Sequence, residues 1–222
     1  ANGSWGLSVI HIVDRVSSTN TWLSRNSSGG NDCILALQQT GGKGRGVRVW
    51  ESHPGGLYLS IISPSHSLLP LIAGISVIQT LVGLKNRLRL KWPNDIILDG
   101  KKVGGILCEG DGKHAVVGIG INLNNSPSFP DSTNLVSIGH DLDEYRFLKS
   151  FSTVFRGNLQ KSNQDIISRF RDYDCLLGRD ISWGEATGIA KSITSDGSLE
   201  VLSDGKLVNL YSGDVHLECS WK

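Results

Sequence analysis

Short apolar segments separated by polar, turn-forming residues dominate the first third of the chain. Residues 8–13, 33–39 and 55–63 are rich in aliphatic and β-branched side chains. Runs of this length between turn signals are typical of strands. The stretch SSTN at 17–20 offers several good N-cap residues, so we predict that a helix begins there, between the first two strands.

The longest apolar run, residues 68–84, predicts a buried helix that extends to about Asn86. Pro70 suits its first turn. The run approaches the length of a membrane span, but its polar residues favour burial in a protein core.

Three strand-like segments follow this helix: LRLKWPNDIIL, KKVGGILCEG and HAVVGIGINLN. Two Asp-Gly pairs separate them, Asp99-Gly100 and Asp111-Gly112. Because Asp-Gly between apolar runs is a hairpin signal, we predict an antiparallel meander.

The second half of the chain changes character twice. Residues 124–139 lack periodicity and hold two prolines, which predicts a long loop of the kind that is often functional. Apolar residues then recur at helical spacing in two stripes, which predict two helices: Leu148, Phe151, Phe155 and Leu159 in the first, and Ile166, Ile167, Phe170 and Tyr173 in the second. After Gly178, short β-rich runs with Asp-Gly turns predict a small barrel. The pattern as a whole predicts an α+β domain followed by a β appendage.

Composition narrows the class of protein. The 222 residues are 39% hydrophobic and 19% charged, which is ordinary for a folded enzyme, and the formal net charge is only +1. Such a charge argues against binding nucleic acid through the whole surface. Four isolated cysteines (Cys33, Cys108, Cys175 and Cys219) and the lack of a visible signal peptide favour free thiols in the cytoplasm. The six histidines show no metal-ligand spacing.

The stretch TGGKGRGVRVWES at 40–52, here called the glycine–cation loop, is the first candidate for chemistry. It fails the P-loop pattern because Gly44 follows Lys43, and it fails the dinucleotide fingerprint at Val47. Glycines allow close approach of a ligand, and Lys43 and Arg45 can neutralise phosphate. A plain surface hairpin is an equally good interpretation of this composition alone.

Three further motifs are weak when each is taken alone. KWPND (91–95) places Pro93 where a strand edge or bulge is expected, which could aim Asn94 and Asp95 outward or simply form a turn. KKVGGILCE (101–109) puts Lys102 before two glycines, and GIGINLN (118–124) ends a strand near Asn122. An exposed hairpin lysine and an asparagine bonded to backbone are the ordinary alternatives.

Together, in this order and spacing, these motifs and a terminal SGDVHLE closely resemble the biotin protein ligases, over essentially the whole chain. The short form without an N-terminal DNA-binding domain is the better match. The resemblance implies a central mixed β-sheet with helices on one side and a small SH3-like C-terminal β-barrel. We accordingly expect a catalytic domain at 1–177 and the barrel at 178–222.

The resemblance also implies a two-step reaction. Biotin and ATP, with Mg²⁺ bound through the phosphates, would give biotinyl-5′-AMP, and a lysine of a biotin carboxyl carrier protein would then take the biotin. The implied biotin-binding residues are Ser18, Thr19, Asn20, Gln38, Lys102 and Gly105. The implied ATP- and adenylate-binding residues are Lys43, Gly44, Arg45, Arg48, Trp50 and Asn122.

Catalysis would depend on positioning and electrostatics, because attack of a carboxylate on a phosphate builds negative charge. Arg45 and Lys102 would flank the α-phosphate, and Asp95 would orient or deprotonate the acceptor amine. No protein-bound metal is expected. Compared with the commoner GRGRRGR form, Lys43 replaces an arginine and Gly46-Val47 replaces Arg-Gly. We expect the glycine–cation loop to act as a mobile lid that orders over the adenylate.

Two rival functions remain at this point. A lipoate–protein ligase shares the fold and the adenylation chemistry, and a biotin-sensing module would bind the ligand without modifying a protein. Neither nucleic acid nor a membrane is an expected partner, and a homodimer is compatible with the resemblance.

Overall fold

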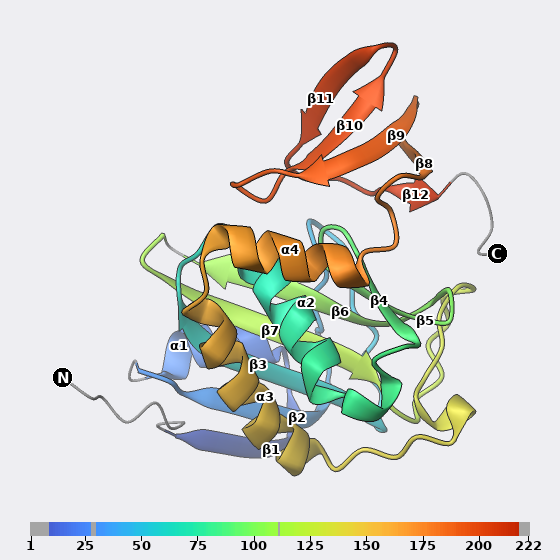
Figure 1. Cartoon of the computed structure of the whole chain (residues 1–222). Coiled ribbons are helices and arrows are strands. Elements are labelled where there is room, and N and C mark those ends of the chain that lie inside the picture. The colour runs from blue at the N-terminus through green and yellow to red at the C-terminus, as the bar shows by residue number, and fades with distance from the viewer. Residues whose placement is uncertain (1–8, 28–29, 111, 218–222) are drawn as a thin grey trace.

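A seven-stranded mixed sheet forms the centre of the molecule in the computed structural model, which describes residues 9–27, 30–110 and 112–217 (Figure 1). The strand order is β1-β2-β3-β7-β6-β5-β4. The strands are β1 (Ile10–Val16), β2 (Cys33–Gln39), β3 (Gly56–Pro64), β4 (Leu88–Lys91), β5 (Asp95–Leu98), β6 (Lys101–Gly110) and β7 (His114–Asn122). Only β1 and β2 pair in parallel; every other neighbouring pair is antiparallel. The predicted meander is therefore confirmed, with the mixed character arising at one edge.

The predicted strands agree closely with the observed ones. The strand expected at 33–39 has these bounds in the structure, and the one expected at 55–63 spans Gly56–Pro64. The strand expected at 8–13 begins at Ile10 and continues to Val16, because Arg15 and Val16 extend the pairing with β2 to Gln38 and Gln39. Ser8, at the start of that prediction, lies outside the described residues.

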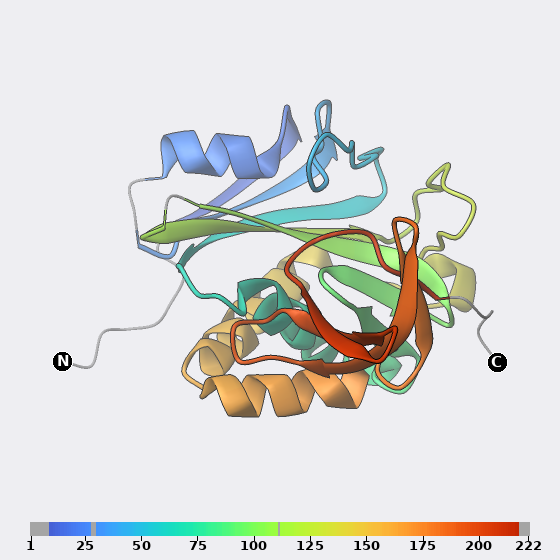
Figure 2. The ribbon, with the colours of Figure 1, turned by 90° about the horizontal axis from the view of Figure 1, so that it is seen from above.

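Helices cover both faces of the sheet, whereas the resemblance implied helices on one side. Figure 2 shows α1 (Thr19–Asn26) on one face, and α2 (Leu69–Thr80), α3 (Glu144–Leu159) and α4 (Asn163–Tyr173) on the other. The large core lies under the three later helices. A small second cluster, centred on Leu23, Ile34 and Val116, packs α1 against the face of the sheet opposite the large core. The position of α1 on its own face matters because the cavity described below opens beside this helix.

Capping residues fix where three of the helices begin. Ser18 caps α1 by accepting a hydrogen bond from the backbone N–H of Thr21, and Asp143 and Ser162 do the same for α3 and α4. Helix α2 ends at Thr80, earlier than the predicted Asn86, and a 3₁₀ turn over Val82–Leu84 continues the apolar run. Helix α2 is buried almost throughout, which confirms the prediction of a core helix. Among the described residues, no helix is both long and apolar enough to cross a membrane.

The WPN segment forms the turn between β4 and β5 and is neither a strand edge nor a bulge. Lys91 pairs with Asp95 across this turn, and the Trp92–Pro93 peptide bond is cis. Because proline donates no backbone hydrogen bond, a turn accommodates it without loss of ladder pairing. The observed bulge lies one strand further on, where the register between β5 and β6 shifts at Ile96/Ile97.

The Asp-Gly turn at Asp99-Gly100 is confirmed. Both residues have positive φ values, 47° and 86°, as a two-residue type I′ hairpin turn requires. In the second predicted turn, Asp111 lies outside the described residues.

The predicted C-terminal barrel corresponds to a five-stranded antiparallel sheet of order β11-β10-β9-β8-β12. Its strands are β8 (Asp180–Trp183), β9 (Ala186–Ile193), β10 (Leu199–Ser203), β11 (Lys206–Leu210) and β12 (His216–Leu217). Figure 1 shows this sheet lying above α4. The buried Trp92 side chain donates from Nε1 to the carbonyl of Gly197, at 2.9 Å, and so ties KWPND to the small sheet.

Three cysteines are free thiols: Cys33 and Cys175 are buried, and Cys108 is half-buried. Burial raises the pKa of each of the three to about 12, so these thiols are unsuited to nucleophilic chemistry. Cys219 lies outside the described residues.

Candidate functional site

A cavity of about 650 Å³ opens on the α1 face of the central sheet. Gly118 and Gly120 form part of its wall and share a strand face with Val116 of the α1 cluster. Every predicted site residue but one lines it: Ser18, Thr19, Asn20, Lys43, Gly44, Arg45, Arg48, Trp50, Asp95, Lys102, Gly105 and Asn122. The structure thus brings together residues that lie up to about a hundred positions apart in the sequence.

The exception is Gln38, which is half-buried but does not line the cavity; the next residue, Gln39, does. Gln39 Oε1 accepts hydrogen bonds from Thr19 N at 2.8 Å and Thr19 Oγ1 at 3.0 Å. Its Nε2 donates to Ser52 Oγ at 2.8 Å. Gln39 ends β2, where the chain enters the glycine–cation loop, and its amide joins Thr19 to Ser52. The predicted contact of Gln38 with biotin stays a prediction.

Thr19 and Asn20 form a polar floor of the cavity, and Ser60, which does not itself line the cavity, lies within hydrogen-bond distance of both. Ser60 Oγ lies 2.8 Å from Thr19 Oγ1 and donates to Asn20 Oδ1 at 2.6 Å. Asn20 Nδ2 donates to Glu109 Oε2 at 2.7 Å and to the Leu107 carbonyl at 3.2 Å. Thr19, Asn20 and Ser60 are each at most 4% exposed. Buried polar groups that satisfy one another in this way hold a fixed geometry toward a ligand.

The glycine–cation loop folds back on itself as a hairpin. Lys43 and Val49 form an isolated antiparallel bridge, the Gly44 N–H donates to the Arg48 carbonyl, and Gly46 takes a positive φ of 61° at the tip. The loop is therefore an ordered surface hairpin here. Its expected mobility stays a prediction.

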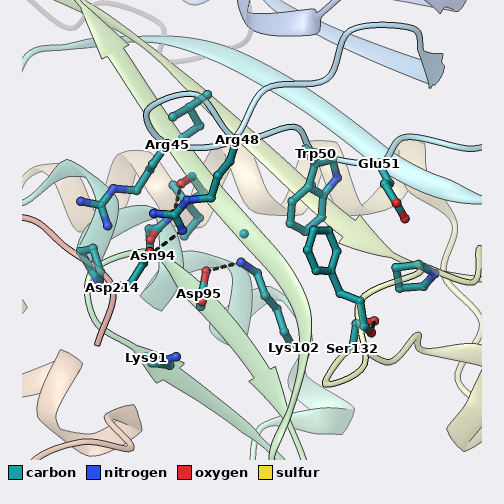
Figure 3. Close-up of a pocket in the computed structure, with 18 of the residues that line it drawn as sticks. Arg45, Arg48, Trp50, Glu51, Lys91, Asn94, Asp95, Lys102, Ser132 and Asp214 are labelled. Atoms are coloured by element: carbon teal, nitrogen blue, oxygen red, sulfur yellow. Dashed lines mark hydrogen bonds and ion pairs between the residues drawn. The ribbon is translucent and has the colours of Figure 1, made fainter. Parts of the chain in front are cut away.

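Two arginines of this loop contact the segment that follows β11. Arg48 Nη1 lies 2.7 Å from Asp214 Oδ1, and Arg45 Nη1 donates to the Gly213 carbonyl at 3.2 Å. In Figure 3 both guanidinium groups lie on the same side of the site, beside Asp214. Burial, and next the charge of Arg48, lower the pKa of Arg45, while Asp214 and Asp95 oppose that change. The small sheet thus supplies a carboxylate that offsets the repulsion between two clustered cations.

Lys102 and Asp95 face each other across the β5–β6 hairpin, with Nζ and Oδ1 2.6 Å apart (Figure 3). The β6 bulge falls next to Lys102. The backbone of Lys102 is held from the other side as well, because its N–H donates to the Asp131 carbonyl and its carbonyl accepts from Thr133 N. An ammonium and a carboxylate are thereby fixed together at the centre of the site.

Trp50 lies flat against two glycines that pair across β6 and β7, Gly105 and Gly120. A Cβ on Gly120 would lie only 2.6 Å from Trp50 Nε1, so glycine is required for this contact. Lys102 Nζ lies 5.5 Å from the centre of the indole ring, within the range of a cation–π interaction. Trp50 Nε1 is buried and has no hydrogen-bond partner among the described residues. A ligand oxygen could accept from it.

The loop predicted at 124–139 forms the remaining wall, with a 3₁₀ turn at Val136–Ile138. Asn122 Nδ2 donates to the Thr133 carbonyl at 3.1 Å, and Asn122 Oδ1 accepts from Asn125 Nδ2 at 3.0 Å. Asn122 therefore fixes this loop to the end of β7. Contact between Asn122 and adenine remains a prediction, and the amide retains bonding capacity for it because it has a second N–H.

Several lining residues had no role in the sequence interpretation. Glu51 accepts from Ser128 N at 2.8 Å and from Ser128 Oγ, which joins the glycine–cation loop to the loop at 124–139. These bonds, the side-chain one first, lower the pKa of Glu51. Gly213 and Asp214 belong to the SGDVHLE motif and Glu51 to the glycine–cation loop, so motif membership was the available signal for these three. Ser128 lies in no motif.

The described residues hold no group of three or more His, Cys, Asp or Glu side chains placed to bind a metal ion. Four carboxylate residues line the cavity, Glu51, Asp95, Asp131 and Asp214.

Comparisons with known proteins agree with this geometry. The model of the biotin/lipoate A/B protein ligase family matches residues 12–124. The biotin–[acetyl-CoA-carboxylase] ligase of Paracoccus denitrificans is 33% identical over 168 residues, which covers 65% of this chain and 70% of that protein.

Two solved structures extend the likeness to nearly the whole fold. The biotin protein ligase of Aquifex aeolicus in complex with biotin and ATP superposes with a TM-score of 0.81 at 30% identity, over 97% of this chain and 99% of that one. The biotin protein ligase of Leishmania major in complex with biotinyl-5-AMP gives a TM-score of 0.68 at 25% identity, over 91% and 98% of the two chains. The present chain belongs to the biotin/lipoate A/B protein ligase family.

Proposed function

We propose that this protein is an ATP-dependent biotin protein ligase, which forms biotinyl-5′-AMP and transfers the biotinyl group to a lysine of a biotin carboxyl carrier domain. The observation that carries the proposal is the arrangement of the cavity. A polar floor at Thr19 and Asn20, supported from behind by Ser60, lies beside a cationic and aromatic wall at Arg45, Trp50 and Lys102. The relatives' ligands, biotin with ATP and biotinyl-5-AMP, have chemistry that matches both halves.

The floor favours biotin over lipoate. Biotin carries a ureido ring with two N–H donors and a carbonyl acceptor, which can bond to the hydroxyl and amide groups of the floor. The dithiolane ring of lipoate has no N–H donor and no carbonyl. Its burial would remove water from the polar groups of the floor without replacing the lost hydrogen bonds.

The wall suits adenylation. When the biotin carboxylate attacks the α-phosphate, negative charge grows on the phosphate oxygens, and Arg45 and Lys102 stand where they can stabilise it. Trp50 offers a flat face to the adenylate. Mg²⁺ is proposed to enter with the phosphates of ATP and to neutralise the departing pyrophosphate. Release of pyrophosphate leaves biotin joined to AMP as a mixed anhydride.

In the second step the acceptor lysine must lose a proton before it attacks the biotinyl carbonyl. The free pKa of a lysine is about 10.4, so a nearby base is useful. Asp95 is the proposed group. Lys102 holds its carboxylate inside the cavity, and a phosphate that draws Lys102 toward itself would free Asp95 for the incoming amine.

The test is incubation of the protein with ATP, Mg²⁺ and a carrier domain, together with either biotin or lipoate, followed by mass measurement of the carrier. We expect a biotinyl gain and no lipoyl gain. A lipoyl gain alone would replace biotin with lipoate as the substrate, and binding of biotin without any transfer would indicate a sensing module.

A further inference from the structure

Glu109, the last residue of the KKVGGILCE motif, contacts the floor of the cavity without being part of the reaction centre. One carboxylate oxygen, Oε2, accepts from Asn20 Nδ2 at 2.7 Å. The other, Oε1, lies 3.9 Å from Lys43 Nζ on the glycine–cation loop. Glu109 thus joins the amide of a nearly buried floor residue to a cation of the loop.

This contact determines which end of the Asn20 amide faces Ser60. A carboxylate and a backbone carbonyl can only accept hydrogen bonds, so the Asn20 atom that faces both Glu109 and Leu107 must be the donor, Nδ2. The oxygen Oδ1 is then directed to the opposite side. There it receives the single hydroxyl hydrogen of Ser60 at 2.6 Å.

The consequence reaches the cavity through Asn20 itself. Asn20 lines the cavity and packs against Gly118, where a Cβ would lie 2.3 Å from Asn20 Oδ1. A carbonyl oxygen has two lone pairs, and Ser60 uses one of them. The second is left for a donor on the ligand. If the amide were reversed, the same position would present N–H groups and would reject a ligand N–H.

We propose that Glu109 is a positioning residue for ligand specificity: it fixes the Asn20 amide so that the floor presents an acceptor to an N–H group of the ligand. The inference rests on the proposed function, in which that N–H belongs to the ureido ring of biotin. The bond from Asn20 to Glu109 is shorter than the bond to Leu107 and is assisted by charge, so Glu109 is the stronger of the two orienting groups.

Replacement of Glu109 by glutamine keeps the shape of the side chain but weakens the preference for one orientation of the Asn20 amide. A glutamine side chain can offer either an oxygen or an NH₂ group to Asn20, so only the longer bond to Leu107 would still select the orientation. We expect Glu109→Gln to weaken biotin binding about fivefold to tenfold. Single-turnover transfer from saturating preformed biotinyl-5′-AMP should change less than twofold, because the floor binds the ureido ring and takes no part in the attack on the biotinyl carbonyl.

The decisive measurement compares three ligands in two proteins, wild type and Glu109→Gln, by calorimetric titration. The ligands are biotin and its cyclic carbamate analogues, in which each ureido N–H in turn is replaced by oxygen. For the N–H that meets Asn20, the wild-type protein should lose at least tenfold in affinity. Glu109→Gln should lose no more than about threefold, because its acceptor is no longer fixed.

A matched control is Glu185→Gln, which makes the same chemical change at an exposed turn of the small sheet. It should keep the wild-type discrimination. Equal losses in wild type and Glu109→Gln would overturn the positioning role, and so would a Glu109→Gln protein that fails to fold, since Glu109 would then be a structural residue. Failure of the wild-type protein to bind biotin would instead overturn the proposed function, and this inference with it.

Discussion

The Lys102 ammonium and the Asp95 carboxylate are 2.6 Å apart on neighbouring strands, and both line the cavity. The pair is only partly shielded from solvent, with side-chain exposures of 37% and 21%. Such a pair contributes little to stability, because solvent screens the attraction and the side chains lose freedom. Its value is in placing two groups of opposite charge within reach of the same reacting atoms.

Asp95→Asn should therefore impair transfer more than folding. The amide retains the size of the side chain but cannot take a proton from the acceptor lysine. We expect single-turnover transfer from preformed biotinyl-5′-AMP to slow by about 10²-fold, at the lower end of the effect of a general base. The melting temperature should change by only a few degrees. Unchanged transfer would rule out the role of Asp95 as a base.

Arg45→Ala should weaken formation of the adenylate and its retention. Removal of one cation from the phosphate wall typically costs about 10²-fold in the rate of the chemical step. Biotin-dependent ATP–pyrophosphate exchange measures formation, and filter binding of labelled adenylate measures release. Arg25→Ala, on an exposed position of α1, is the matched control. Normal exchange together with slow release in Arg45→Ala would refute the assignment of this loop.

The sequence predicts those features of the site that neighbouring residues determine, and it misses those that depend on residues far apart in the chain. Strands β2 and β3 were placed well because each is a contiguous apolar run between turn residues. The two glutamines at 38 and 39 could not be distinguished, because the end of a strand breaks the simple alternation of faces. The partnership of Arg48 with Asp214 spans most of the chain, and no local pattern encodes it.

The resemblance filled much of that gap, and the structure then added what motifs omit. The motif containing Lys102 and Gly105 predicted that both lie at the site, but not that the loop at 124–139 holds the Lys102 backbone. The sequence also did not reveal that α1 covers a different face of the sheet from the other helices. The apolar stripe of one short helix does not specify which face of a sheet it covers.

Asp214→Asn should loosen the glycine–cation loop. The change removes the carboxylate that pairs with Arg48, so the two loop arginines would repel each other without compensation. Because the pair is about half exposed, we expect a modest effect, with adenylate release about twofold to fivefold faster. The effect should shrink as salt is added. Asp204→Asn, in an exposed turn of the same sheet, should leave release unchanged; equal rates in the two variants would contradict a role for the contact.

Asp174, just after α4, should make the protein more stable in mild acid. Its Oδ1 accepts from the backbone N–H groups of Leu176 and Leu177, while Oδ2 is buried without a partner among the described residues. Burial raises the pKa of this carboxyl from 3.8 to about 6, against the opposing effect of the two backbone donors. The contribution of Asp174 to the free energy of unfolding is therefore complete below about pH 4 and is lost as the pH rises through 6.

Urea unfolding at pH 5 and pH 7.5 tests this sign. Once the partial exposure of Asp174 is allowed for, the wild-type free energy of unfolding should be higher at pH 5 by on the order of 1 kcal/mol from this group. Asp174→Asn stays neutral at both pH values, so the difference between variant and wild type should change with pH. A constant difference would mean that Asp174 does not titrate in this range.

Gly120→Ala should displace Trp50 and so damage adenylation at a distance from the charged groups. The added methyl group would lie 2.6 Å from two atoms of the indole, which is too close for any non-bonded contact. We expect pyrophosphate exchange to fall about tenfold or more, with the sheet still folded. Gly157→Ala, at a helical position with open space, is the control and should stabilise α3 by about 0.5–1 kcal/mol.

The origin of that loss can be isolated with a second substitution. Trp50→Phe places a smaller ring beside the new methyl group and relieves the clash. If the damage comes from displacement of the indole, Gly120→Ala combined with Trp50→Phe should lose less activity than the two single variants predict together, because the residues are in direct contact. Strict additivity of the two losses would show instead that Gly120 acts on the ligand through its own backbone.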